Sequence, residues 1–207
     1  MNEIVLSRRL RAEYSVSPGW VTVLSNLIRD GNVVIQSSLR ASQHSSRQIN
    51  LGDGIFDGTE LLLSGGNYGI GSDSNVFIAF AVALRLLEYS QRLVRNERHV
   101  MTNKTGSIGR ALYNDALAGG AQALGRKSGS ITPGKWADLL TLDADALTLW
   151  GCADDEFLDR WIFTGDDSLV REVWSAGRQM VSDGQHIQHH EIEQRYRTVI
   201  QEIRREK

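Results

Sequence analysis

The most informative stretch of this chain is Gly69-Ile-Gly-Ser-Asp-Ser-Asn75, a turn of small residues that holds a single aspartate, Asp73. The turn follows a short apolar run and precedes a predicted helix, so the carboxylate lies at the carboxyl end of a predicted strand. In a parallel α/β barrel, active sites are built at that end of the strands. Asp73 is therefore either a metal ligand with an acid/base role or the N-cap of the helix, because Asp and Ser are common caps.

The segments around this turn have the spacing of helices. A short helix is predicted over 58–64, where glycines stop it, and a short buried strand is predicted over 68–70. A second helix is predicted over 107–124, and its many glycines and alanines indicate close packing. A long helix is predicted over 77–94, where the residues at helical spacing are Ile78, Ala81, Val82, Arg85, Leu86, Tyr89 and Leu93.

Beyond residue 127 the period changes from helical to strand-like. The pairs Ala176-Gly177 and Asp183-Gly184 frame a hairpin-like segment over 178–181, and a charged helix over 191–205 closes the chain. Strands are predicted over 137–142, 160–163 and 170–174. The tryptophans on or beside these strands are expected to pack in the core or against the sheet, and they are Trp136, Trp161 and Trp174.

Composition limits the partners and the compartment. The chain has 207 residues and a net charge of −2, which predicts binding to neither nucleic acid nor an anionic membrane. The longest apolar stretch, 76–87, is interrupted by Arg85 and is too short to span a bilayer. A single cysteine, Cys152, excludes an internal disulfide and fits a reducing compartment, so we expect a cytoplasmic protein.

The first 49 residues differ from the rest of the chain. They contain six arginines, no lysine, nine serines and three acidic residues, without a clear helical or strand period. An Arg- and Ser-rich leader with few acids is typical of a transit peptide. The alternative is a segment that has lost the sequence its fold once required, through a fusion or a shifted reading frame.

From Asn50 to about Arg197 the chain resembles the carboxyl-terminal half of an amidohydrolase-superfamily enzyme, and the formimidoylglutamate deiminases are the nearest likeness. Gly129-Ser-Ile-Thr-Pro-Gly-Lys-Trp-Ala-Asp-Leu-Leu140 carries a motif shared by many amidohydrolases. Leu84-Arg-Leu-Leu-Glu-Tyr89 and Asp159-Arg-Trp-Ile-Phe163 are more particular to the deiminases. The other matching segments are 50–56, 69–74, 118–125 and 170–178.

The resemblance implies a fold and a cofactor. The expected fold class is α/β, namely the last part of a metal-dependent (β/α)8 barrel with part of its flanking β-sandwich. The expected domains are an unmatched segment 1–49, the last barrel units 50–126, the β-sandwich portion 127–190 and a terminal helix 191–207. In such enzymes an aspartate at the end of the eighth strand binds a single Zn²⁺ and shuttles a proton, and Asp73 matches that position.

The remaining zinc ligands have no counterpart in the sequence. A catalytic zinc ion takes about three protein ligands and a water molecule. The family draws histidines from a His-x-His pair on the first barrel strand and from strands in the middle of the barrel. This chain has only five histidines, none in a matching motif, and they are His44, His99, His186, His189 and His190. Although 186–190 has metal-like spacing, we interpret it as a solvated turn.

We therefore expect a truncated copy that lacks barrel strands one to six and is inactive in isolation. Asn75 stands where the deiminases usually carry a histidine, and Val82 and Ala83 replace two expected acidic residues, which puts substrate handling in doubt. In a complete relative, N-formimidoyl-L-glutamate and water would give N-formyl-L-glutamate and ammonia, as a step of histidine degradation. Intact relatives are implied to be homodimers that act on this small-molecule substrate.

Two other hypotheses remain open. The chain is either a non-catalytic remnant or interaction module, or a subunit that docks on a partner supplying the missing strands. Zinc content and ammonia release separate these hypotheses from a catalytic role.

Overall fold

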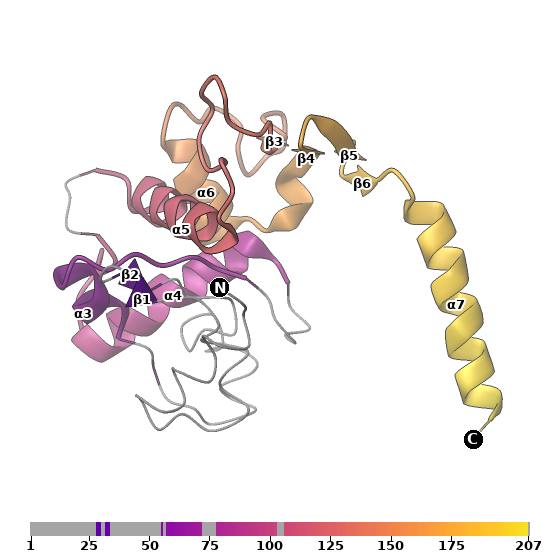
Figure 1. Ribbon diagram of the computed structural model, residues 1–207, viewed down its shortest axis with the longest axis horizontal. Coiled ribbons are helices and arrows are strands. Elements are labelled where there is room, and N and C mark those ends of the chain that lie inside the picture. The colour runs from indigo at the N-terminus through magenta and orange to yellow at the C-terminus, as the bar shows by residue number, and fades with distance from the viewer. Residues whose placement is uncertain are drawn as a thin grey trace.

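The computed structural model describes residues 55, 57–71, 78–102 and 106–206, with the backbone of two short strands before them (Figure 1). These strands, β1 (Ile28–Arg29) and β2 (Asn32–Val33), pair antiparallel. Within the described ranges, four helices form the main body, and they are α3 (Gly58–Leu63), α4 (Phe80–Arg95), α5 (Ile108–Leu124) and α6 (Glu156–Thr164). A four-stranded sheet and a terminal helix, α7 (His189–Arg205), complete the described part.

The sequence predicts the ends of the helices well. Asp57 caps α3 by accepting a hydrogen bond from the Glu60 amide, and Ser107 caps α5 by accepting one from the Arg110 amide. Gly125 ends α5 in the left-handed conformation, at φ 61°. The helices predicted over 58–64, 77–94, 107–124 and 191–205 are confirmed within the described residues.

The buried face of α4 differs from the set of residues that the sequence singled out. Of that set only Ala81 is fully buried, whereas Ile78 and Leu93 are 72% and 78% exposed. The buried face follows another stripe of the same helix, whose members are Ala81, Leu84, Leu87, Glu88, Ser90 and Gln91. Both stripes have helical spacing, and only the packing against α5 and α6 selects between them.

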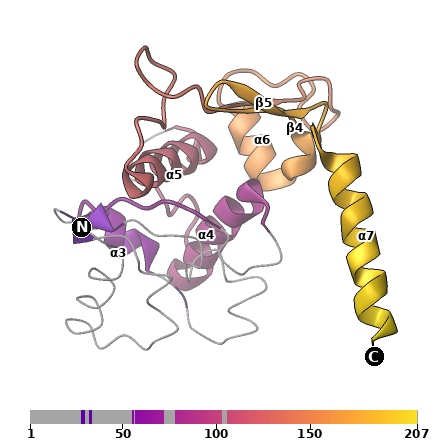
Figure 2. The ribbon, with the colours of Figure 1, turned by 45° about the vertical axis from the view of Figure 1, so that its right-hand side comes forward.

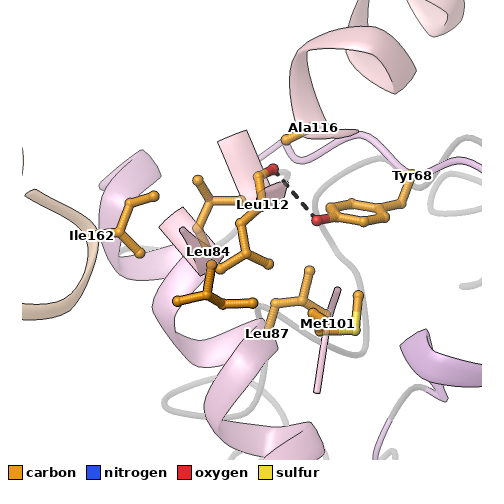
Figure 3. Close-up of a cluster of buried hydrophobic side chains, with 8 residues drawn as sticks. Tyr68, Leu84, Leu87, Met101, Leu112, Ala116 and Ile162 are labelled. Carbon is orange, nitrogen blue, oxygen red and sulfur yellow. Dashed lines mark hydrogen bonds between the residues drawn. The ribbon is translucent and has the colours of Figure 1, made fainter. Parts of the chain in front are cut away.

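Two adjoining clusters make up the core between the helices. In the first, Leu84 and Leu87 of α4 contact Leu112 of α5 and Ile162 of α6, with Tyr68 and Met101 closing the cluster (Figure 3). The second cluster lies around Trp161 of α6 and includes Ala81, Leu149, Leu158 and Leu169. The α6 helix is thus packed into the same core as α4 and α5.

Helix α6 corrects the prediction of a strand over 160–163, which is wrong. Leu158, Trp161 and Ile162 lie at positions i, i+3 and i+4, so one face of a helix is buried. Acidic residues in the first turn, Glu156 and Asp159, favour a helix start. A run of four residues rich in aromatic and branched side chains is too short to distinguish a strand from part of a helix by its pattern alone.

The remaining strands form one antiparallel sheet in the order β3 (Leu139–Leu142), β4 (Val170–Ser175), β5 (Arg178–Ser182) and β6 (Gln185–His186). Strands β4 and β5 are joined at Ala176-Gly177, and β5 and β6 at Asp183-Gly184, with positive φ at all four residues. Two-residue turns of that kind match the twist of paired strands. The predicted hairpin and the strands over 137–142 and 170–174 are confirmed, although β3 is only half-buried.

The predicted strand over 68–70 is not formed: these residues have no strand partner among the described residues, although Tyr68 is buried. The described strand pairs are all antiparallel. The barrel and sandwich therefore stay predictions. Of the three tryptophans, Trp161 is buried in α6, Trp174 is half-buried in β4, and Trp136 is 51% exposed with Arg126 over its ring.

Figures 1 and 2 show α7 standing apart from the other helices, beyond the end of the sheet. No residue of α7 is buried. None of the helices in the described ranges combines the length and the apolar character needed to cross a membrane.

Candidate functional site

Asp73, the predicted metal ligand and acid/base group, lies outside the described residues, as do its neighbours from Ser72 to Phe77. The structure describes the two segments that lead into and out of this stretch. The contacts of these two segments are the supports of the candidate site.

The segment before Asp73, residues 67–71, lies against α5. A β-carbon on Gly119 would collide with the carbonyl group of Tyr68, and one on Gly69 would lie 2.8 Å from the amide nitrogen of Gly120. The Tyr68 hydroxyl donates a hydrogen bond to the Leu112 carbonyl, at 3.4 Å. The small residues of α5 thus allow the backbone that leads to Asp73 to lie directly on the helix, which confirms the predicted close packing.

The segment after Asp73 is held by α6 and the turn that follows it. The Phe80 amide, at the start of α4, donates to the Asp167 carboxylate at 3.2 Å. Arg85 donates from Nε to the Ile162 carbonyl at 2.6 Å and from Nη2 to the Gly165 carbonyl. Partial desolvation raises the pKa of Asp167 above its usual value, while the hydrogen bonds from the α4 backbone oppose that shift.

Arg85 and Asp167 are the positioning residues that the sequence did not reveal. Their partners lie 77 to 87 positions away in the chain. In the structure the Asp166 side chain caps the short 3-10 helix over Asp167–Leu169. No local signal identified their contacts with α4 and α6.

A groove of about 550 Å³ lies between α5 and the segment over 128–140. Phe80 and Tyr113 are among the residues that line it, and the Phe80 ring centre lies 6.1 Å from those of both Tyr113 and Trp161. Burial raises the pKa of Tyr113 above its usual value. Of the polar residues that line the groove, Arg110 is ion-paired with Asp155 and Asp138 lies 3.7 Å from Arg126. The groove is therefore an apolar surface with a paired polar rim.

The described histidines do not form a metal site. His186, His189 and His190 lie near the sheet end and the start of α7, where His190 contacts Gln194 and His189 lies 3.8 Å from Glu193. Across the described ranges no group of three His, Cys, Asp or Glu side chains could hold a metal ion. His44 lies outside those ranges. Zinc is therefore not accommodated by the described residues alone.

Tyr68, which is buried in the segment that leads to Asp73, should make the chain less stable at alkaline pH. Burial, followed by the charges of Asp115 and Glu88, raises the pKa of Tyr68 well above its ordinary value of 10.0. The folded state keeps this proton while the unfolded chain loses it, so the free energy of unfolding should fall as the pH rises through about 10. The free energy of unfolding of Tyr68→Phe, measured in urea, should fall less with rising pH than that of the parent chain. Tyr89→Phe, at an exposed tyrosine of α4, is the control and should show the same fall as the parent chain. If the free energy of unfolding falls equally with pH in the parent chain and in Tyr68→Phe, the titration of Tyr68 does not cause the decrease.

Comparison with known proteins identifies the family of the chain. Residues 14–180 match the sequence model of the Amidohydrolase family. The chain is 49% identical over 142 residues to the formimidoylglutamate deiminase of Pseudomonas aeruginosa, which covers 68% of this chain and 31% of that enzyme. It is 32% identical over 142 residues to a probable guanine deaminase of Schizosaccharomyces pombe, covering 62% of this chain and 26% of the relative. The chain thus spans about a third of the length of these relatives or less.

Solved structures show the same relationship. An amidohydrolase from Brucella melitensis superposes with a TM-score of 0.70 at 31% identity, over 96% of this chain and 47% of that one. A zinc-bound adenosine deaminase from Xanthomonas campestris gives 0.63 at 21% identity, over 95% and 48%. A zinc-bound atrazine chlorohydrolase from Arthrobacter aurescens gives 0.62 at 17% identity, over 97% and 47%. The last two show a shared fold alone.

The family match begins at residue 14, within the first 49 residues for which the sequence suggested no counterpart. The origin of those residues and the predicted domain limits stay predictions. Because the match extends over most of the sequence, the chain belongs to the amidohydrolase family.

Proposed function

We propose that this chain supplies the carboxyl-terminal part of a formimidoylglutamate deiminase-like hydrolase, and that Asp73 is its contribution to the active site. The identity of 49% to the Pseudomonas aeruginosa enzyme carries this proposal. It is supported by the packing of residues 67–71 on α5 and by the Asp167 and Arg85 contacts of α4. These contacts hold the segments on both sides of Asp73 to one helical core.

The reaction of the complete enzyme would be hydrolysis of N-formimidoyl-L-glutamate to N-formyl-L-glutamate and ammonia. The Asp73 carboxylate would accept a proton from the attacking water and return it to the departing ammonia. A hydrolytic zinc ion, when bound, makes water a nucleophile at neutral pH. Since no three described residues could hold that ion, its other ligands must come from outside the described part of the chain.

We expect the isolated chain to bind less than one equivalent of zinc and to release no ammonia from formimidoylglutamate. Both are measured on purified protein, by metal analysis and by an ammonia assay. Ammonia should be released after mixing with a polypeptide that carries the remaining, amino-terminal part of the Pseudomonas aeruginosa relative. In that mixture Asp73→Asn should lower the rate by roughly 10²–10⁴-fold, the usual contribution of an acid/base group.

Asp145→Asn, a substitution at an exposed loop aspartate, serves as the matched control and should leave the rate unchanged. Zinc-dependent turnover by the isolated chain would contradict the expected inactivity. A stable complex of the two parts that holds zinc and releases no ammonia would contradict the proposed reaction.

A second candidate function is a non-catalytic module that associates through its β segment and helices. Large apolar side chains exposed around the sheet favour it, and they are Ile131, Trp136, Leu147 and Trp150. Exposed apolar surface of this kind marks interaction sites. This candidate predicts association without zinc and without ammonia release, even after the amino-terminal part is added.

A further inference from the structure

The apolar residues of α7 form a regular stripe that nothing in the described structure covers. Ile192, Tyr196, Val199 and Ile203 are separated by four, three and four residues, which is the spacing of the contact positions in a coiled coil. They are 53%, 65%, 49% and 50% exposed, although such a stripe on a helix normally faces a partner. Ile200 lies beside the stripe and widens it.

The α7 helix, which carries the stripe, is attached to the sheet at its start and stabilised by an ion pair between side chains one turn apart. The Ile187 amide donates to the Met180 carbonyl at 3.0 Å, which ties the chain just before α7 to strand β5. Arg197 donates from Nε to the Glu193 carboxylate at 3.1 Å, one turn away, and this hydrogen bond and ion pair lower the pKa of Glu193. Pairs at this spacing stabilise a helix. The stripe is therefore presented on a formed helix that projects from the body (Figure 2).

We propose that α7 pairs with the α7 helix of a second copy of this chain, in the antiparallel direction. With the two helices centred on the stripe, Ile192 lies opposite Ile203 of the second copy and Tyr196 lies opposite Val199. Each apolar side chain then finds an apolar partner, and the two-fold symmetry repeats every contact. The pairing goes beyond the proposed catalytic role and does not depend on Asp73.

Charge selects this direction. Arg195 and Glu202 flank the same side of the stripe. In the antiparallel arrangement, Arg195 of one copy faces Glu202 of the second copy, and Glu202 of the first faces Arg195 of the second. Charges in these flanking positions set the orientation of paired helices. Within its own helix Arg195 lies 3.6 Å from Glu191, and Glu202 has no ion pair with any described residue. In a parallel pair of α7 helices, Arg195 would instead face Ile200, which offers no charge.

The test is the concentration dependence of the mass of the full-length chain, measured by sedimentation equilibrium with circular dichroism to check folding. The parent chain should form a dimer, and Val199→Lys should weaken dimerisation at least tenfold because it places a charge in the stripe. Gln201→Lys, on the opposite side of α7, is the matched control and should leave the dimer intact. Arg195→Glu should also weaken the dimer, and adding Glu202→Arg to it should restore the dimer.

Each other result overturns the proposal. A parent chain that stays monomeric has no self-association to explain. Self-association that survives Val199→Lys uses another surface, such as the exposed side chains around the sheet. Failure of the Arg195→Glu and Glu202→Arg combination to recover the dimer excludes the antiparallel arrangement.

Discussion

Replacing Glu88 by alanine should lower the free energy of unfolding by about 3–5 kcal/mol, the cost of breaking a buried ion pair by removing one partner. Glu88 lies in α4 and is fully buried. Its Oε1 accepts hydrogen bonds from Arg92 Nε at 2.7 Å and from the Val100 amide at 3.0 Å. Its Oε2 accepts one from the Met101 amide at 2.8 Å. One carboxylate therefore holds the chain that leaves α4.

The loss is large because the Glu88 carboxylate accepts hydrogen bonds from both amides and from the Arg92 guanidinium. Without Glu88 the two amides are left in a region that also contains Met101 and Leu87, which are almost fully buried, whereas the Arg92 side chain is 22% exposed. An unsatisfied buried donor costs its full desolvation free energy. Glu88→Gln should lower the free energy of unfolding less than Glu88→Ala does, because one side-chain oxygen remains as an acceptor. It should still be destabilising, because the NH2 group of glutamine would face a hydrogen-bond donor.

Urea unfolding monitored by circular dichroism measures these differences. Glu97→Ala is the control, because Glu97 lies on the exposed turn that the Glu88 carboxylate holds. It should change the free energy of unfolding by less than about 0.5 kcal/mol, as is usual for surface substitutions. A similar loss for Glu97→Ala and Glu88→Ala would show that the measured loss does not come from the buried hydrogen bonds.

Glu88 also shows where the sequence is silent. A glutamate four residues before an arginine is typical of an exposed pair on a helix surface. The pattern contains no sign that the backbone of Val100 and Met101 folds back onto the pair. Local patterns predicted the α4 helix, but only the tertiary contacts show which of its faces is buried.

The rest of the fold shows the same difference between features set by local sequence and features set by tertiary contacts. The helix ends at Ser107 and Gly125 and the turns at Ala176-Gly177 and Asp183-Gly184 were predictable, because each depends on the chemistry of neighbouring residues. Helix α6 was mistaken for a strand, because its buried face is defined by packing against α4 and α5.

At the candidate site, the sequence identifies Asp73, and the structure shows which residues hold the segments on either side of it. Asp73 was identified from its turn and from the resemblance to amidohydrolases, and its role stays a proposal. The family itself is confirmed by the match over residues 14–180. Arg85 and Asp167 could not be predicted as supports, because the residues they contact come from distant parts of the chain.

Two adjacent glycines of α5 allow the support before Asp73 to be tested with substitutions of opposite effect. Gly119→Ala should lower the free energy of unfolding by about 3 kcal/mol, at the upper end of the cost of overpacking a core. The added β-carbon would meet the carbonyl group of Tyr68 and the amide nitrogen of Gly69. All of these are backbone atoms, so no rotation of a side chain can relieve the collision, and α5 must move away from residues 67–71.

Gly120→Ala should instead raise the free energy of unfolding by about 0.5–1 kcal/mol, because alanine favours a helix more than glycine does. Among the described residues, and apart from the adjacent residues and backbone of α5 itself, no atom lies within 4 Å of the position that its β-carbon would take. Both substitutions add one methyl group to the same helix, so urea unfolding compares them directly. If both destabilise the chain equally, the cost arises from α5 in general, and the close contact between Gly119 and Tyr68 does not position the segment that leads to Asp73.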